Sequence, residues 1–251
     1  MKVQEIAAHE ADFESRGIDS SGKKFQLTRS SIDIPNSTEK MKYTKLTPIS
    51  GNKSFYYEEA FTKDQIVLHY TLGFLKGDIA TLSRYNNHVS VPFVIGRNGT
   101  IYNLFFSGYW SYHLGEGAVR GNKKRSQKTI GIEISNIGGL NLTKDGLVSY
   151  YRKVYCELNK KNFFEQKNFR RFSYYAAFTD AQYQSLIVLL RYLTARYNID
   201  RKFLPEQERY TTKQDIVNFK GIVSHVNYRE SGKEDIGPAF DWERLIREVR
   251  R

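Results

Sequence analysis

Cysteine is almost absent from this 251-residue sequence, in which Cys156 is the only one. A single cysteine cannot form an intramolecular disulfide, and zinc modules built on two or four cysteines are equally excluded. The sequence offers five histidines and 27 acidic residues as alternative ligands. Any metal site must therefore draw mainly on histidine and carboxylate side chains.

Long apolar segments are also missing. No window of the sequence approaches the roughly 18 apolar residues that a membrane-spanning helix needs. The first 31 residues carry Glu5, Glu10 and Glu14 where a secretory signal peptide would need an uninterrupted apolar stretch. We therefore expect no signal peptide and no membrane insertion, and we predict a soluble protein that stays in the cytoplasm unless another system moves it.

Acidic residues are outnumbered by basic ones. The 39 Lys and Arg residues against 27 Asp and Glu residues give a formal net charge of +12. This charge favours an anionic partner, and nucleic acid, an anionic membrane surface and a bacterial envelope with phosphate polymers all fit it. The hydrophobic fraction of 40% is typical of a folded globular protein.

The N-terminal part of the chain differs from the rest. Residues 1–60 are polar and have few regularly spaced apolar positions, which predicts an N-terminal extension without a core of its own. The aromatic residues 55–57 could pack onto the domain that begins after this extension. We predict one folded domain over residues 61–251, which is within the usual size range of a domain.

Short apolar runs in this domain predict strands. Residues 66–71 form a continuous apolar run, which is typical of a strand buried on both faces. The Asn98-Gly99 pair between two β-rich runs predicts an antiparallel hairpin. Residues 129–135 alternate in polarity, which places three isoleucines on one face and Glu133 on the other.

Apolar residues at helical spacing are found in four segments: 78–85, 143–158, 179–197, and from about 238 onward. The third segment opens on a capping box formed by Thr179 and Gln182. Residues 160–175 are basic and aromatic, which predicts a surface loop or an insertion. Strands with intercalated helices predict an α/β fold with a central mixed β-sheet flanked by helices.

Two histidines coincide with apolar runs. His69 interrupts the run 66–71, where a buried imidazole must be hydrogen-bonded or coordinated, and a core histidine bonded to a carbonyl fits as well as a metal ligand. His225 ends a second apolar run and precedes Asp235. These three residues could form a zinc site with an open fourth position, although their spacing matches no short metal motif.

Two charged residues have more than one interpretation. Glu133 is unusual within isoleucine-rich alternation, so either its face is exposed to solvent or its carboxylate has a function. Lys233 lies in a polar turn, two residues before Asp235, and an exposed charged turn is the commoner interpretation of such a pair.

Six segments occur in order along the chain: Ile66-Val67-Leu68-His69-Tyr70-Thr71, Phe93-Val94-Ile95-Gly96-Arg97-Asn98-Gly99-Thr100-Ile101-Tyr102, Trp110-Ser111-Tyr112-His113-Leu114-Gly115, Ile130-Gly131-Ile132-Glu133-Ile134, Phe178-Thr179-Asp180-Ala181-Gln182, and Ser224-His225 with Lys233-Glu234-Asp235-Ile236-Gly237-Pro238. In this order they resemble the zinc-dependent N-acetylmuramoyl-L-alanine amidases of the type 2 amidase and peptidoglycan-recognition-protein family. The resemblance covers about residues 60–247.

The resemblance implies a mixed sheet with Zn²⁺ in a groove, and hydrolysis of the amide bond between N-acetylmuramic acid and L-alanine in bacterial peptidoglycan. It makes three residues the metal ligands: His69, His225 and Asp235. Glu133 would be the general base and acid, and Lys233 would stabilise the oxyanion. His113 looks like the histidine of the family's groove, which implies a contact with the substrate.

Two positions depart from the family pattern. Val91 stands where some members have a catalytic tyrosine, so Glu133 must carry the role of the base. Ile236 stands where the family commonly has proline, and we expect this change to affect loop stiffness more than chemistry.

The favoured setting is a bacteriophage endolysin or a similar lytic enzyme, made in the host cytoplasm and acting on the cell wall after release. Its positive charge would attract it to an anionic wall, with a steep dependence on salt. One alternative is a cytoplasmic amidase that recycles muropeptides. Another is a non-catalytic peptidoglycan-binding or virion structural protein with the same fold. We expect no nucleic-acid partner, because only the charge and the basic stretch 160–175 favour one.

Overall fold

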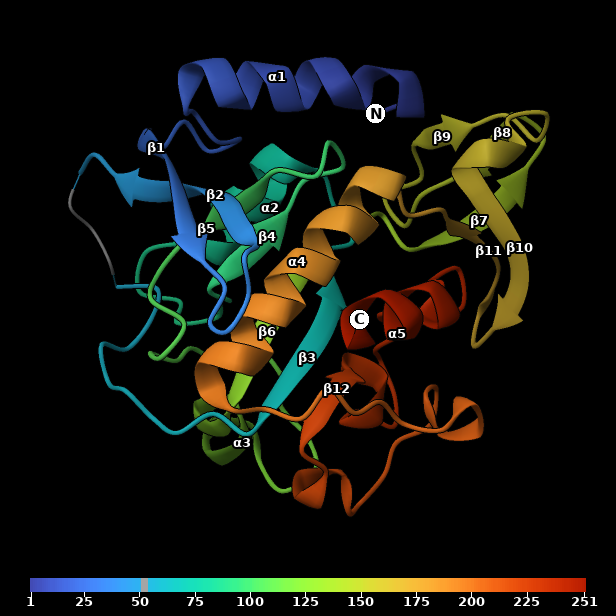
Figure 1. The fold of residues 1–251 in the computed structure, drawn as a ribbon. Coiled ribbons are helices and arrows are strands. Elements are labelled where there is room, and N and C mark those ends of the chain that lie inside the picture. The colour runs from blue at the N-terminus through green and yellow to red at the C-terminus, as the bar shows by residue number, and fades with distance from the viewer. Residues whose placement is uncertain (51–53) are drawn as a thin grey trace.

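The computed structural model describes residues 1–50 and 54–251, and its strands form two sheets (Figure 1). The seven-stranded sheet has the order β1 (Phe25–Asp33), β2 (Lys40–Pro48), β5 (Ile101–Asn103), β4 (Phe93–Ile95), β6 (Thr129–Ile134), β3 (Gln65–Tyr70) and β12 (Gly221–Ser224). The five-stranded sheet has the order β10 (Phe164–Phe169), β11 (Phe172–Ala176), β7 (Gly139–Thr143), β8 (Gly146–Val148) and β9 (Val154–Cys156). The helices are α1 (Ile6–Arg16), α2 (Leu75–Leu82), α3 (Asn122–Lys128), α4 (Asp180–Tyr197) and α5 (Trp242–Arg250).

The centre of the larger sheet confirms the predicted strands. β3 pairs in parallel with both β6 and β12, and β4 pairs in parallel with β6 and antiparallel with β5. The sheet is therefore mixed, as the sequence predicts. Because β3, β6 and β12 run in the same direction, the side chains at their carboxyl ends meet at one edge. In this register His69 lies opposite Glu133.

The two faces of the sheet bury different elements. Alternate residues of β3 and β6, such as Ile66 and Ile132, share a core with α4 and α5. Figure 1 shows α4 crossing this face with α5 beside it. Val94 of β4 faces the other way and shares a second core with α1 and α2. His69 and Glu133 alternate with the isoleucines, so they project from the face opposite α4.

The N-terminal residues add regular structure that the sequence analysis did not assign. Strands β1 and β2 form an antiparallel pair, and β2 continues the sheet in parallel with β5. Phe13 of α1 and Phe25 of β1 are buried in the same core as α2, together with Phe55. These residues therefore pack on the remainder of the chain. The division at residues 60 and 61 stays a prediction.

One helix between β6 and α4 was predicted wrongly. The helix predicted over residues 143–158 is replaced by the end of β7 and by β8 and β9. Tyr151 and Leu158, two residues at the helical spacing of that segment, are 60% and 43% exposed. Gly146 has a φ of +117°, and a Cβ atom there would lie 2.7 Å from the carbonyl oxygen of Cys156, which favours a tight turn between strands. Residues 160–175, predicted as a surface loop or an insertion, largely form the β10–β11 hairpin, so the loop interpretation is wrong and the insertion stays a prediction.

Three predicted helices are confirmed with adjusted ends. α4 begins after Thr179, whose hydroxyl accepts from the backbone N–H of Gln182, and the capping box is complete. α5 begins at Trp242, later than predicted, because Asp241 caps it. α2 starts three residues before the predicted segment 78–85 and ends at Leu82.

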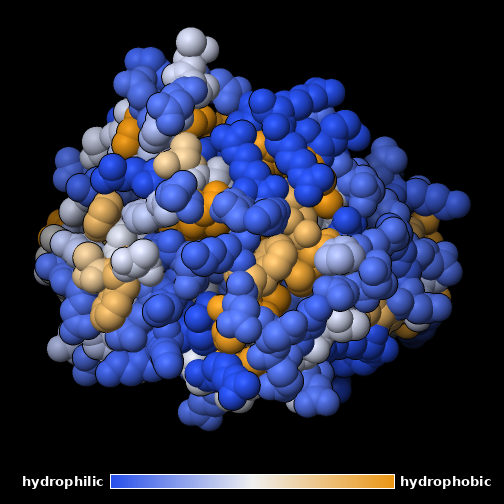
Figure 2. All heavy atoms as spheres, turned by 60° about the horizontal axis from the view of Figure 1, so that its bottom comes forward, coloured by the Kyte–Doolittle hydropathy of each residue, from blue (hydrophilic) through white to orange (hydrophobic). Residues whose placement is uncertain are grey.

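One face of the molecule is mostly polar. Figure 2 shows a face on which hydrophilic side chains dominate and apolar ones form small areas between them. Among residues 1–50 and 54–251, no helix is both long enough and apolar enough to cross a bilayer.

Asp78 in α2 joins the carboxyl ends of two central strands to that helix. Its Oδ2 accepts a 2.6 Å hydrogen bond from the hydroxyl of Ser135, which comes directly after β6, and the hydroxyl of Thr71, which comes directly after β3, also interacts with it. Burial raises the pKa of Asp78 from 3.8 to about 7, and the nearby charge of Glu10 acts in the same direction.

This shift predicts a pH-dependent stability. Between pH 3.8 and about 7 the folded state holds a proton on Asp78 that the unfolded chain has lost, so the free energy of unfolding falls as pH rises through this window. From pH 5 to pH 8 the loss should be about 2 to 3 kcal/mol. Asp78→Asn should remove this part of the pH dependence in urea unfolding, whereas the exposed Asp145→Asn should keep it. Parallel curves for wild type and Asp78→Asn would contradict the prediction.

Candidate metal centre

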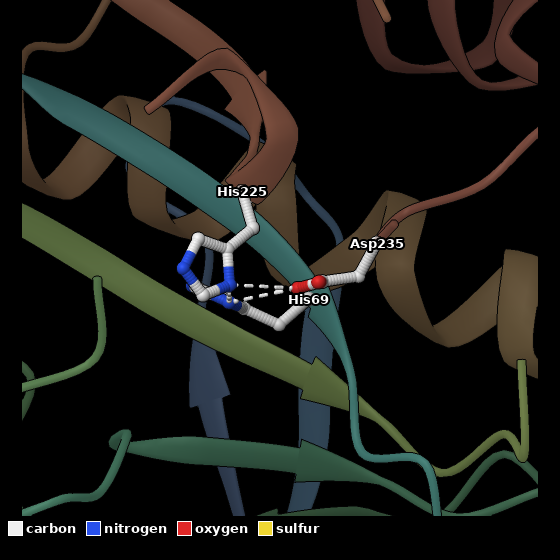
Figure 3. Close-up of side chains that lie close together, drawn as sticks. All are labelled: His69, His225 and Asp235. Carbon is white, nitrogen blue, oxygen red and sulfur yellow. Dashed lines mark hydrogen bonds and ion pairs between the residues drawn. The ribbon is translucent and has the colours of Figure 1, made fainter. Parts of the chain in front are cut away.

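Three side chains meet at the carboxyl edge of the central sheet. His69 is the fifth residue of β3, and His225 comes directly after the neighbouring parallel strand β12. Asp235 comes from the loop beyond, where its carbonyl accepts from the backbone N–H of Val226. Figure 3 shows the two imidazoles and the carboxylate pointing toward one another. All three side chains are buried, and they are a group that could hold a metal ion.

The donor atoms have the spacing of a metal site. His69 Nδ1 lies 2.8 Å from His225 Nδ1 and 3.2 Å from Asp235 Oδ2, and His225 Nδ1 lies 2.9 Å from the same oxygen. Ligand atoms around a tetrahedral zinc ion with bonds of about 2.0 to 2.1 Å are about 3.3 Å apart. The three atoms therefore need only a small outward movement to coordinate zinc.

The outer hydrogen bonds show which ring nitrogens carry a proton. His225 Nε2 lies 2.9 Å from the carbonyl oxygen of Leu114, and a carbonyl only accepts, so Nε2 carries a proton. The Thr129 hydroxyl donates to the Arg125 carbonyl and therefore accepts from His113 Nε2, which is 2.8 Å away.

The hydrogen bond to His113 shows which nitrogen of His69 carries a proton. His113 Nδ1 has no proton and accepts from His69 Nε2 at 3.0 Å. In the neutral state that metal ligation requires, the Nδ1 atoms of His69 and His225 would each direct a lone pair at the carboxylate of Asp235. Three electron-pair donors converge on one point, which is the arrangement that a cation stabilises.

The electrostatics agree with this arrangement. Burial lowers the pKa of His69 to about 4, and the neighbouring His225 acts in the same direction. Burial alone would raise the pKa of Asp235, but His225 and His69 hold it well below its usual range. At neutral pH His69 is therefore neutral and Asp235 is ionised, which are the states that metal ligands require.

His113 lies behind His69. Both of its ring nitrogens are used in the hydrogen bonds to His69 and Thr129. Burial and the charges of His69 and His225 keep its pKa well below the usual range. The predicted substrate contact of His113 stays a prediction, and the structure adds a contact with a candidate ligand that the sequence analysis did not foresee.

Glu133 lies beside the cluster on β6, opposite His69 in the parallel register. Its Oε2 is buried and has no hydrogen-bond partner among the described residues. Burial raises its pKa well above the usual range, the charge of Asp235 adds to this shift, and that of Lys233 opposes it. Lys233 is therefore close enough to act on Glu133, as it also does on His69. The structure brings all six predicted site residues into one region.

Gly131 makes room for the site, and sequence reasoning missed it. It lies two residues before Glu133 on the same face of β6, and a Cβ atom there would be 2.6 Å from Val91 Cγ1 and 3.0 Å from His113 Cγ. An isolated glycine inside a strand pattern is the sequence signal for such a close approach.

Gly131→Ala is therefore expected to displace the His113 ring and to lower the free energy of unfolding by about 1 to 3 kcal/mol. Chemical denaturation and zinc titration would measure the effect. Gly77→Ala is the control, because the nearest atom to a Cβ there is 3.9 Å away, and in helix α2 it should stabilise slightly. Equal stability of Gly131→Ala and wild type would show that the ring does not need this space.

The comparisons with known proteins agree on one family. A model of the family N-acetylmuramoyl-L-alanine amidase (Amidase_2) matches residues 61–238. The curated N-acetylmuramoyl-L-alanine amidase AmiD of Escherichia coli strain K12 is 28% identical over 188 residues, which are 73% of this chain and 52% of that protein. The chain thus spans about half the length of this curated relative.

The solved structure of one relative shows the same fold. A complex of AmiD from Escherichia coli with the substrate anhydro-N-acetylmuramic acid-L-Ala-D-gamma-Glu-L-Lys has a TM-score of 0.50 at 23% identity and covers 76% of this chain and 59% of that chain. AmpDh3 from Pseudomonas aeruginosa has a TM-score of 0.46 at 18% identity and covers 87% of this chain and 66% of that chain. Because the family model matches well over half of the residues, this protein belongs to the Amidase_2 family of N-acetylmuramoyl-L-alanine amidases.

Proposed function

We propose that this chain is a zinc-dependent amidase that cleaves the bond between the lactyl group of N-acetylmuramic acid and L-alanine in peptidoglycan. The observation that carries the proposal is the convergence of His69 Nδ1, His225 Nδ1 and Asp235 Oδ2 beside the buried Oε2 of Glu133, which has no hydrogen-bond partner among the described residues. The family match and the donor chemistry both support zinc as the metal.

Zinc in such a site supplies a Lewis acid for the scissile carbonyl and lowers the pKa of water toward about 7. Glu133 is the general base, because a carboxyl group with a raised pKa holds a proton more readily near neutral pH. Its free Oε2 takes the proton of the attacking water and then delivers it to the departing amine of L-alanine.

Lys233 and His113 complete the proposed site. The ammonium group of Lys233 stabilises the negative charge that develops on the carbonyl oxygen. His113 contacts the substrate at the groove and orients His69 through the hydrogen bond between Nδ1 and the Nε2 of His69. Val91, which stands where some relatives have a catalytic tyrosine, is buried and apolar, so it offers no proton donor.

The preferred substrate, intact cell wall or soluble muropeptide, distinguishes two possible biological roles. We propose a lytic enzyme of the endolysin type that acts on intact wall, because a net charge of +12 favours encounter with an anionic polymer. A recycling amidase is the second candidate, because the E. coli relative was solved with an anhydro-muropeptide as its substrate.

The experiment compares purified sacculi with anhydro-muropeptides, with and without a chelator, and scores new L-alanine amino termini and new reducing sugar ends. Chelator-sensitive amino termini without reducing ends are expected. A higher turnover on sacculi would support the lytic role, and turnover on soluble muropeptides alone would support recycling. Wall binding and bound zinc without any release would overturn the proposal in favour of a non-catalytic protein.

A further inference from the structure

The loop that carries Lys233 and Asp235 is poorly held by its own backbone. No backbone–backbone hydrogen bond joins residues 230–234 to any other described residue. The Arg229 N–H donates to Val226 before this stretch, and the carbonyl of Asp235 accepts from Val226 after it. Other contacts must therefore fix the two functional side chains at its end.

These contacts come from the tip of the β10–β11 hairpin, the Arg170-Arg171 turn. Arg170 donates through Nη1 to the carbonyl of Lys233 and through Nη2 to the carbonyl of Arg229 at 3.1 Å. One guanidinium group thus joins both ends of the loop. Arg171 Nε forms a 2.9 Å ion pair with Oε1 of Glu234, whose side chain is only 9% exposed.

The turn itself is held in place by aromatic residues. The Tyr175 hydroxyl donates a 2.6 Å hydrogen bond to the carbonyl of Phe169, and the Phe169 ring packs on Tyr210 at 5.5 Å between centroids. Arg171 lies over the ring of Phe172 at 4.9 Å. The two guanidinium groups are therefore oriented before they meet the loop.

The backbone of Arg170 also points to a role for its side chain. Its φ is +50°, in the left-handed region that favours glycine or asparagine in a hairpin turn. An arginine there carries a conformational cost that glycine would avoid. The contacts with the loop offset this cost.

We propose that Arg170 and Arg171 are positioning residues: the tip of the second sheet clamps the loop 229–235 and so places Lys233 and Asp235 in the metal centre. This inference rests on the proposed function, because it concerns the same site. It gives the five-stranded sheet a role that the family resemblance did not supply.

The test uses the full chain and two substitutions of Arg170. Arg170→Gly removes the guanidinium and relieves the left-handed backbone, so the hairpin should remain folded. Arg170→Lys keeps the charge but loses the planar fork that joins two carbonyls. Lys167→Ala, at an exposed position of the same hairpin, is the control that lowers the charge without touching the loop.

Zinc affinity is measured by competition with a chromogenic chelator, and the amide hydrogen exchange of residues 229–235 is measured by mass spectrometry. Both Arg170 variants should bind zinc about tenfold more weakly or worse and should exchange faster in this loop. Arg171→Ala should show the same change to a lesser extent, with recovery in Arg171→Lys. Lys167→Ala should match wild type.

Unchanged zinc affinity and unchanged loop exchange in Arg170→Gly and Arg170→Lys would overturn the clamp. Faster exchange with wild-type zinc affinity would also overturn it, because the loop would then not control the metal centre. If wild type bound zinc but hydrolysed no amide, the proposed function would fail, and the zinc and exchange data would still decide the inference.

Discussion

Replacing Glu133 by glutamine should lower amide hydrolysis by about 10² to 10⁴-fold, the range typical of a lost general acid–base group. The glutamine side chain has nearly the same shape, so it should fit the same place on β6. It cannot accept a proton at neutral pH, and the substitution removes a carboxylate whose Oε2 is buried and has no hydrogen-bond partner in the described part of the chain. The loss should appear in kcat, because proton transfer belongs to the transition state.

Zinc affinity separates this outcome from a damaged site. Glu133 makes no hydrogen bond to the three candidate ligands, so Glu133→Gln should bind zinc as wild type does. The pH profile should also lose the limb that reports ionisation of the base. Glu165→Gln on the exposed face of β10 is the matched control. Full activity of Glu133→Gln on either substrate would remove Glu133 from the mechanism.

Local patterns predicted the elements at the centre of the fold. The apolar run of β3, the Asn98-Gly99 turn and the capping box of α4 each depend on neighbours within a few residues, and all three are confirmed. The failure between β6 and α4 has the opposite cause. Over residues 143–158 the apolar spacing fits a helix by coincidence, because Tyr151 and Leu158 are exposed in the structure and so mark no buried helical face.

The N-terminal strands were missed for a related reason. Most residues of β1 are exposed on both faces, so alternation of polarity, the usual signal of a strand, is absent. What holds β1 is nine registered pairs with β2, from Phe25 opposite Pro48 to Asp33 opposite Lys40. Pairing of this kind depends on backbone hydrogen bonds, which any side chain permits, and so it leaves little trace in the sequence.

In the candidate site, too, local sequence identified some residues, whereas contacts between distant parts of the chain were not predicted. His69 is a candidate because an imidazole in a buried strand needs a hydrogen bond or a metal ion. Composition and spacing alone did not identify which of the two it has. The groups that support the ligands come from distant parts of the chain: Leu114 contributes a backbone carbonyl, Thr129 a hydroxyl, and Arg170 a guanidinium group that binds a loop carbonyl. A backbone carbonyl is present at every residue, so its use as a hydrogen-bond acceptor for a ligand cannot be predicted from the sequence.

Removing one of the candidate ligands should have the second large effect. His225→Asn should abolish detectable zinc binding, because Nδ1 of His225 is the donor that lies within 2.9 Å of both other donor atoms. Amide hydrolysis should then fall by at least about 10² to 10³-fold, the amount associated with one lost electrostatic contact to a transition state. His88→Asn, at a left-handed position where asparagine is well tolerated, is the matched control.

Stability gives a readout that does not depend on turnover. Zinc binds only the folded chain, so at a free concentration 100 times its dissociation constant it should stabilise wild type by about 2.7 kcal/mol. His225→Asn should gain nothing from the same zinc, and His88→Asn should gain as much as wild type. If zinc stabilised His225→Asn as strongly as wild type, the metal would bind elsewhere, and the convergence of two imidazoles on Asp235 would need another explanation.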